Sequence, residues 1–188
     1  MIIKSELDYA HLITTLKNTA NEVNGTYESI GTSVVFKGSS ERLKEIFKIT
    51  DEFEHDFIHA VTHFKEGIIG PYITEKYFML IPGLKAAMAQ LKDDCVETRR
   101  CIMQFPPEHC FQSMQFLVRE NTVHVICYMR SCNAIKNLPH DLWICSKMAD
   151  IFAKYYEDAF GEHLYPYHSI TMMFGSLHVF KGETLDVL

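Results

Sequence analysis

The residues of this chain that could do chemistry are concentrated between Arg99 and Asp141. This stretch contains a pair of arginines, a cysteine (Cys110) shortly after a Pro-Pro sequence, the dipeptide Arg130-Ser131 and the carboxylate of Asp141. An exposed cysteine beside arginines favours the thiolate, which is the nucleophilic form of the side chain. We therefore expect two basic sites, one thiol and one carboxylate to be held on loops framed by apolar strands, which is how a fold positions reacting groups; for the arginine pair taken alone, the alternative is a solvated strand end.

The six cysteines of the chain all lie between residues 95 and 145. The N-terminal sequence does not resemble a secretory signal, so we expect reduced thiols in a cytoplasmic protein rather than a disulfide framework. For Cys110 taken alone, the alternative to a nucleophile is a buried structural thiol, which is the commoner role of cysteine inside cells. The neighbouring motifs decide between the two.

Length and composition indicate one soluble globular domain that spans residues 1–188. The chain has 188 residues, of which 47% are hydrophobic and 22% charged, and its formal net charge is -6. This acidic balance argues against broad binding of DNA or RNA, because such binding needs a basic surface. No apolar run reaches the length of a membrane-spanning helix, so we also expect no membrane partner.

Hydrophobic periodicity and turn signals predict an α+β fold in which helices flank a central mixed or antiparallel sheet. Residues 112–119 and 122–129 form a predicted hairpin across Glu120-Asn121. Both faces of its second strand are mostly apolar, so the hairpin should lie centrally in the sheet. Further strands are predicted at 27–37, 99–105 and 168–180, the last broken at Gly175-Ser176. Helices are predicted at 1–24 (ended by Asn24-Gly25), 41–47, 51–64, 76–92 (beginning near Pro82) and 141–160.

Three histidines, His55, His59 and His63, recur at four-residue steps in the predicted helix 51–64 and would share one face. Neutral imidazoles on one helical face can bind a metal ion together. The alternative is a solvated polar face, because acidic residues surround the histidines and helix-borne ligand pairs usually need a third group from elsewhere. We favour the solvated face and predict no metal site.

Taken in order, the motifs between residues 70 and 180 resemble those of the thymidylate synthase superfamily. The matching pieces are GPY, the paired arginines, CFQSMQF with its Gln-Phe after the cysteine, RSCNAIKNLPHD and the late GSLHVF. No single piece is decisive, but the ordered set is specific. The resemblance implies a thymidylate synthase-like domain that dimerises through its sheet.

The resemblance implies a reaction at C5 of a pyrimidine nucleotide. In this family a thiolate attacks C6 of the pyrimidine and makes C5 nucleophilic, and 5,10-methylenetetrahydrofolate supplies the one-carbon unit. Cys110 takes the place of the attacking cysteine, and Tyr72 that of a tyrosine near the reacting base. Both are therefore catalytic candidates.

The resemblance also implies a set of substrate-binding side chains. Arg130 and Ser131 would bind the nucleotide phosphate, and His178 would bind its ribose. The pair Arg99 and Arg100 would reach the phosphate from the partner subunit, so the resemblance implies a homodimer. The full implied set is Arg99, Arg100, Gln115, Arg130, Ser131, Cys132, Asn133 and His178.

Asp141 departs from the family pattern, which has asparagine where uracil is read. An ionised carboxylate only accepts hydrogen bonds, so it suits the exocyclic amino group of cytosine. The same replacement is typical of the deoxycytidylate and CMP hydroxymethylases of the superfamily, in which water captures the transferred carbon. We therefore expect hydroxymethylation of dCMP or CMP. The alternative for Asp141 is a helix cap after Leu-Pro.

Three further substitutions distinguish the chain from the family pattern. Phe111 replaces a common histidine, Asn133 replaces an aspartate that contacts folate, and Phe180 replaces a tyrosine that binds the sugar. A second reading, a non-catalytic protein that binds pyrimidine nucleotides, is supported by Phe111, Asn133 and the short segment after the last predicted strand, and it is opposed by the intact Cys110. A third reading keeps dUMP as the substrate.

Overall fold

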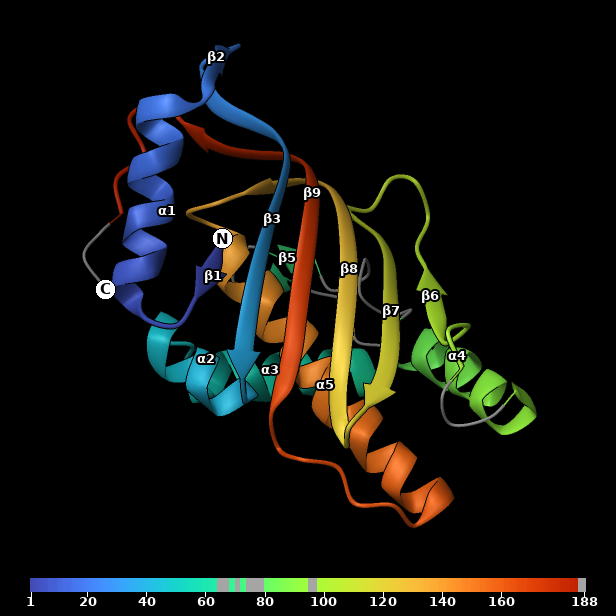
Figure 1. Cartoon of the computed structure of the whole chain (residues 1–188). Coiled ribbons are helices and arrows are strands. Elements are labelled where there is room, and N and C mark those ends of the chain that lie inside the picture. Colours follow the sequence, from blue (N-terminus) through green and yellow to red (C-terminus); the bar gives the residue numbers. More distant parts are fainter. Residues whose placement is uncertain (64–67, 70–71, 74–79, 95–97, 186–188) are drawn as a thin grey trace.

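A seven-stranded mixed sheet forms the centre of the protein, and helices cover one of its faces (Figure 1). The computed structural model describes residues 1–63, 68–69, 72–73, 80–94 and 98–185. The strands are β1 (Ile2–Ile3), β2 (Asn21–Val23), β3 (Thr26–Gly38), β4 (Ile68–Ile69), β5 (Tyr72–Ile73), β6 (Ile102–Gln104), β7 (Phe111–Arg119), β8 (Thr122–Asn133) and β9 (His168–Phe180). The helices are α1 (Glu6–Thr19), α2 (Ser40–Phe47), α3 (Asp51–His63), α4 (Leu80–Asp94) and α5 (Leu138–Phe160).

The strand order in the sheet is β1-β3-β9-β8-β7-β6, and β2 pairs with β3 beside this path. The pairs β1–β3 and β8–β9 are parallel, whereas the other pairs are antiparallel. Parallel neighbours need a crossover connection, and α5 lies in the connection from β8 to β9. The structure thus confirms one mixed α/β domain built on a mixed sheet with flanking helices.

The predicted hairpin is present as β7 and β8. Its turn consists of Glu120 and Asn121, both with positive φ (50° and 57°). Two such residues make a two-residue turn whose twist matches that of the flanking strands. β8 lies between β7 and β9, but β7 is next to the edge strand β6, so only the second strand of the hairpin is central.

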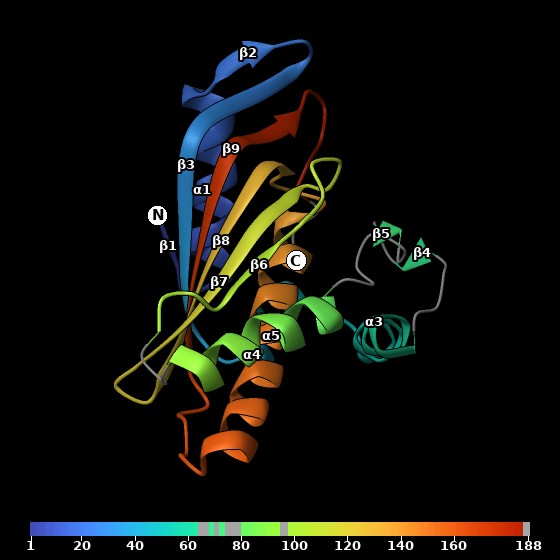
Figure 2. The same ribbon diagram turned by 90° about the vertical axis from the view of Figure 1, so that its right-hand side faces the viewer.

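Figure 2 shows the sheet nearly edge-on, with the described helices on one side of it. Burial follows this arrangement: Val34 and Phe36 of β3 are fully buried, whereas the intervening side chains face away from the helices. We call the uncovered side the open face. In the main part of the sheet, the open face includes Ser33, Val35, Lys37, Ile102, Gln115, Leu117, His124, Ile126, Tyr128, Ser169, Thr171 and Met173.

The long helix α5 connects the covered face of the sheet to the other helices. Phe152 stacks on Phe116 of β7 with ring centroids 4.9 Å apart, and Trp143 meets Phe57 of α3 edge-on at 5.8 Å. All four side chains are almost fully buried. Their contacts fix α5 between sheet and α3. Among the described residues, no helix combines the length and the apolar character needed to cross a membrane.

Three adjacent strands share an interruption of their pairing, which we call the sheet kink. The ladder between β8 and β9 skips Arg130 and Gly175, and the ladder between β3 and β9 skips Gly31 at the same level. The side chains change face there. Met129, before the kink, and Cys132, three residues further on, are both buried on the side of the helices. In a regular strand, residues three apart would face opposite sides. The kink therefore reverses the alternation of β8.

The N-terminal prediction is wrong at both ends of its helix. Residues 1–24 contain the short strands β1 and β2 around α1, which begins after the cap residue Ser5 and ends before Ala20. Asn24-Gly25 does not end the helix. Both residues have positive φ and form the turn of the β2–β3 hairpin. Asn-Gly is a strong signal for a hairpin turn, and at this position it forms such a turn and does not end a helix.

The C-terminal half also differs from prediction in three places. Helix α5 begins at Leu138 after the cap residue Asn137, so the interpretation of Asp141 as a helix cap is wrong. Strand β9 continues through Gly175, where the pairing alone is interrupted. The edge strand β6 covers only residues 102–104 of the predicted 99–105. The predicted helix 76–92 falls partly outside the described residues, and α4 begins at Leu80.

Replacement of Gly175 by alanine tests the sheet kink. A Cβ atom there would lie 2.7 Å from the carbonyl oxygen of Arg130 and 3.2 Å from the Tyr128 hydroxyl. We expect Gly175→Ala to lower the free energy of unfolding in urea by about 1–3 kcal/mol, because backbone must move to admit the methyl group. The control is Gly83→Ala in α4, where the new methyl meets the flexible end of Met103. That change should be neutral or stabilising by up to about 1 kcal/mol. Equal effects in the two variants would contradict the account.

Candidate functional site

Cys110 lies on an exposed corner directly before β7, and Arg130 holds that corner in place. The backbone N–H of Arg130 donates to the carbonyl oxygen of Cys110 at 2.9 Å. Its guanidinium donates through Nε to the carbonyl of His109 and through Nη2 to that of Glu108, both at 3.2 Å. No described residue accepts a hydrogen bond from Nη1. The corner thus carries an exposed thiol and is held by a guanidinium that keeps spare donors.

Asp141 and Cys132 form a buried pair on the covered side of the sheet. Asp141 is 2% exposed in the first turn of α5, where the helix dipole favours a negative charge. The Cys132 thiol donates to its Oδ2 atom at 3.3 Å. Burial and the nearby Asp141 carboxylate raise the pKa of Cys132 well above its usual value. Cys132 therefore stays protonated and serves Asp141 as a hydrogen-bond donor.

Cys110 differs from the other described cysteines in its exposure. Cys101, Cys127, Cys132 and Cys145 are buried, and all five described cysteines are free thiols. Burial raises the pKa of Cys101 to about 12 and that of Cys127 well above its usual value. Buried thiols of this kind are inert. Within the described residues, Cys110 is the thiol that a substrate can reach.

Beyond the sheet kink, polar side chains gather on the side away from Cys132. His178 of β9 pairs with Asn133 on one side and with Glu28 of β3 on the other. Ser176, two residues before His178, donates a hydrogen bond to Glu28. Burial lowers the pKa of His178, and the negative charge of Glu28 opposes that shift. The predicted ribose-binding histidine therefore has a carboxylate neighbour that the sequence motifs did not indicate.

Asn133 has its hydrogen-bonding groups engaged within the chain. Its Oδ1 atom accepts from the backbone N–H groups of Ile135 and Lys136 at 2.9 and 2.8 Å. Its Nδ2 atom donates to both carboxylate oxygens of Glu183, at 3.2 and 3.0 Å. Burial alone would raise the pKa of Glu183, but its hydrogen bonds from Lys136, the Phe180 N–H and Asn133 lower it. Asn133 thus fixes the turn after β8 to the segment after β9.

The arginine pair lies away from Cys110 within one chain. Arg99 and Arg100 are exposed just before the edge strand β6. Gln115 of β7 donates from Nε2 to the carbonyl oxygen of Arg99 at 2.6 Å. Gln115 is five residues along β7 from Cys110, a distance of about 16 Å at about 3.3 Å per residue. The structure therefore does not bring Arg99, Arg100 and Gln115 to the thiol of their own chain.

The other predicted residues are described only in part. Tyr72 pairs with Ile69 in the small β4–β5 sheet, and its side chain lies outside the described residues. The rings of His55 and His59 are 6.0 Å apart on α3, whereas the His63 side chain also lies outside. In the described part of the chain, no three His, Cys, Asp or Glu side chains are placed to share a metal ion.

The predicted site residues whose side chains are described thus fall into three groups, and the third, which consists of Arg99, Arg100 and Gln115, is the one near the edge strand β6. The first is Cys110, Arg130, Cys132 and Asp141, which surround the end of β8. The second, Ser131, Asn133 and His178, lies on the adjoining β8–β9 ladder. Two residues that sequence reasoning missed, Glu28 and Glu183, contact the second group. Glu28 is placed there by strand pairing and Glu183 by a chain reversal, and neither has a local sequence signal.

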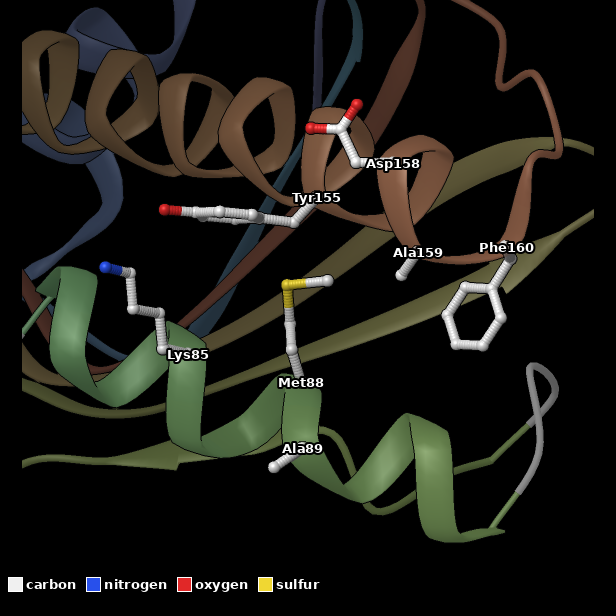
Figure 3. A pocket seen from close by; sticks show the side chains of 7 residues that line it. All are labelled: Lys85, Met88, Ala89, Tyr155, Asp158, Ala159 and Phe160. Carbon is white, nitrogen blue, oxygen red and sulfur yellow. The ribbon is translucent and has the colours of Figure 1, made fainter.

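A cavity of about 370 Å³ lies between α4 and α5, away from all of these residues. Figure 3 shows the side chain of Met88 extending from α4 toward α5, with Lys85 and Tyr155 at one end. The lining residues are Lys85, Met88, Ala89, Tyr155, Asp158, Ala159 and Phe160. No thiol lines it and its lining is mostly apolar, so it is not a candidate for the reaction.

Comparisons with known proteins place no further constraint on the site. No protein-family model matches the chain, and no curated protein matches it at a significant level.

Proposed function

We propose that this protein is an enzyme that hydroxymethylates C5 of a cytidine nucleotide, dCMP or CMP, with 5,10-methylenetetrahydrofolate as the one-carbon donor. One observation carries the proposal: the exposed Cys110 lies on a corner whose backbone is joined to that of Arg130 by a hydrogen bond of 2.9 Å, and the Arg130 guanidinium binds the carbonyl oxygens of the two residues before Cys110. A nucleophile and an anion-binding group on one corner suit attack on a phosphorylated substrate.

In this mechanism the Cys110 thiolate forms a bond from Sγ to C6 of the pyrimidine. The electron pair of the C5–C6 double bond moves to C5, which becomes a carbon nucleophile. Without an electrophile, C5 takes a proton from water, and reversal of the addition releases the original hydrogen. This exchange at C5 needs only the nucleotide and the chain's own residues.

Asp141 would select cytosine over uracil. An ionised carboxylate accepts the exocyclic N–H of cytosine but has nothing to donate to O4 of uracil. Its burial would make a mismatched base costly, because a buried polar group left without its partner loses about 1–3 kcal/mol. The dUMP alternative requires a donor at this position, which only a protonated Asp141 would supply.

Folate binding is the part of the reaction that the described contacts support least. The resemblance assigns the pterin contact to Asn133, but the amide of this residue is engaged by Ile135, Lys136 and Glu183. In this proposal the described residues of the site therefore serve the nucleotide. The same observation favours the second candidate function, a protein that binds pyrimidine nucleotides without one-carbon chemistry.

A homodimer through the part of the open face near the sheet kink, away from Lys37, His124 and Ser169, would complete the phosphate site. Tyr128 and Met173 on this face are each 41% exposed, and Ile102 at its edge is 42% exposed. A two-fold dimer would cover these apolar side chains. It would also let Arg99 and Arg100 of the partner subunit serve the Cys110 site, from which they are remote in their own chain.

Tritium release from C5-labelled nucleotides tests the thiol chemistry. We expect release from dCMP or CMP, and a loss of at least about 10³-fold in Cys110→Ala, because no other described thiol is accessible. Cys101→Ala, which removes a buried thiol from the neighbourhood of the edge strand, is the control and should retain release. Tight nucleotide binding without release from any nucleotide would instead establish the binding-protein alternative.

Replacement of Asp141 by asparagine should reverse the choice of base. We expect Asp141→Asn to lower kcat/KM for tritium release from dCMP or CMP by about 10²-fold or more, and to raise that for dUMP, because the amide can donate to O4. The measurement is the ratio of the two rates in each variant, which cancels losses of folded protein. An unchanged ratio would show that Asp141 does not read the base.

The oligomer is tested by charge placed on the open face. Met173→Lys should convert a dimer to a monomer in sedimentation velocity, because two buried lysines would meet the partner. Leu7→Lys, at an apolar residue 78% exposed on α1, is the control and should leave the dimer intact. A monomeric wild-type protein would contradict the proposed dimer.

Mixing two inactive variants tests whether the arginines act across the dimer. Cys110→Ala and Arg100→Ala are each expected to lose most release. Random exchange of subunits between equal amounts gives one intact site in half of the dimers, so the mixture should recover about one quarter of wild-type release. No recovery, with heterodimers present, would show that Arg100 serves the site of its own chain.

A further inference from the structure

A second cavity, of about 340 Å³, lies at the other end of the sheet from Cys110. It forms where β3 ends, β9 begins and the β7–β8 hairpin turns. Cys110 and Arg119 are nine residues apart along β7, a distance of about 30 Å at about 3.3 Å per residue. The lining residues are Lys37, Gly38, Arg119, Glu120, Thr122, His124, Tyr167, His168 and Ser169. We call it the hairpin cavity.

Strand pairing brings basic side chains together in the hairpin cavity. Lys37 of β3 pairs with Ser169 of β9, which pairs in turn with His124 of β8. These three are therefore neighbours in one row on the open face, and Arg119 lines the same cavity from the hairpin. Lys37 makes no ion pair with any described residue. The lining includes one carboxylate, that of Glu120, against two permanent positive charges.

The electrostatic field at His124 shows that positive charge prevails in the cavity. Burial lowers the pKa of His124, and the charges of Lys37 and Arg119 lower it further. Glu120 acts in the opposite direction but does not cancel them. An anion entering the cavity would be attracted by Lys37 and Arg119 and would in turn favour the protonated form of His124.

We propose that the hairpin cavity binds the phosphate group of a small phosphorylated molecule. Lys37 and Arg119 offset the phosphate charge, and the His124 imidazole and the hydroxyl groups of Ser169 and Thr122 offer hydrogen bonds beside them. A volume of about 340 Å³ is that of a small-ligand pocket and leaves room for an organic group next to the phosphate. The site is separate from the nucleotide site proposed at Cys110.

Imidazole NMR of the full-length protein tests the proposal with inorganic phosphate as the probe, at constant ionic strength and pH 7.5. The His124 resonances, identified by their loss in His124→Gln, should shift saturably with a dissociation constant on the order of 1 mM. Lys37→Gln should weaken this binding about tenfold. Lys154→Gln, which removes an exposed lysine from α5, is the control and should leave it unchanged. Equal weakening by both variants, or shifts that do not saturate, would mean an adventitious ion only and would overturn the proposal.

The pH dependence of sulfate binding separates His124 from the other groups that face the cavity. Sulfate keeps its charge between pH 5.5 and pH 8, whereas phosphate does not. The other charged or titratable groups that face the cavity are Lys37, Arg119, Glu120, Tyr167 and His168, whose Nε2 atom lies 2.7 Å from Asp150, and all of them are unchanged in the His124→Gln comparison. Because His124 binds the anion better when protonated, affinity should fall as the pH rises. Isothermal titration of His124→Gln should show a flat profile, and an unchanged slope would overturn the assignment of His124.

Discussion

The sheet kink is the constraint on which the candidate site depends. Side chains alternate along a strand, so an interruption at Arg130 and Gly175 exchanges the two faces of everything that follows. It delivers the thiol of Cys132 to the buried Asp141, and it turns Ser176 and His178 toward the opposite side. Without it, β8 and β9 would continue their alternation into the core, and the polar groups beyond the kink would point at the helices.

The helices hold this arrangement through both apolar and charged contacts. Glu54 of α3 forms ion pairs with Lys147 of α5 at 2.5 Å and with Lys44 of α2 at 2.6 Å. Asp150 of α5 lies 2.7 Å from His168 of β9. Burial raises the pKa of Glu54, but the two lysines outweigh it and keep the pKa low. These partly buried pairs join three helices and a strand at one place, and removal of one partner would leave a charge without its counterion.

Much of the architecture could be predicted from local sequence. The β7–β8 hairpin, β3, α2 and β9 follow from periodicity and turn residues, because both signals act over a few positions. The Asn24-Gly25 turn was misread because the same pair suits the end of a helix and a hairpin. Cys110 and Arg130 could be proposed as candidates from the sequence because each belongs to a contiguous motif. Glu28 was missed because β3 and β9 pair across more than a hundred residues, so only the folded chain reveals that this carboxylate lies next to His178. Glu183 was missed because only the folded chain brings it to Asn133.

The position of β9 between β3 and β8 has a consequence for the way the sheet is made. β9 is the last strand of this sheet in chain order, yet it joins the N-terminal strands to the β6–β8 meander. On a ribosome, two half-sheets would emerge first, each with an unpaired edge that can bind another chain. Closure waits for residues 168–180, and because its pairings are non-local, it is intrinsically slow. The central strand β9 is therefore the last strand of the sheet to pair. The nascent chain is most exposed to aggregation in the interval before β9 pairs.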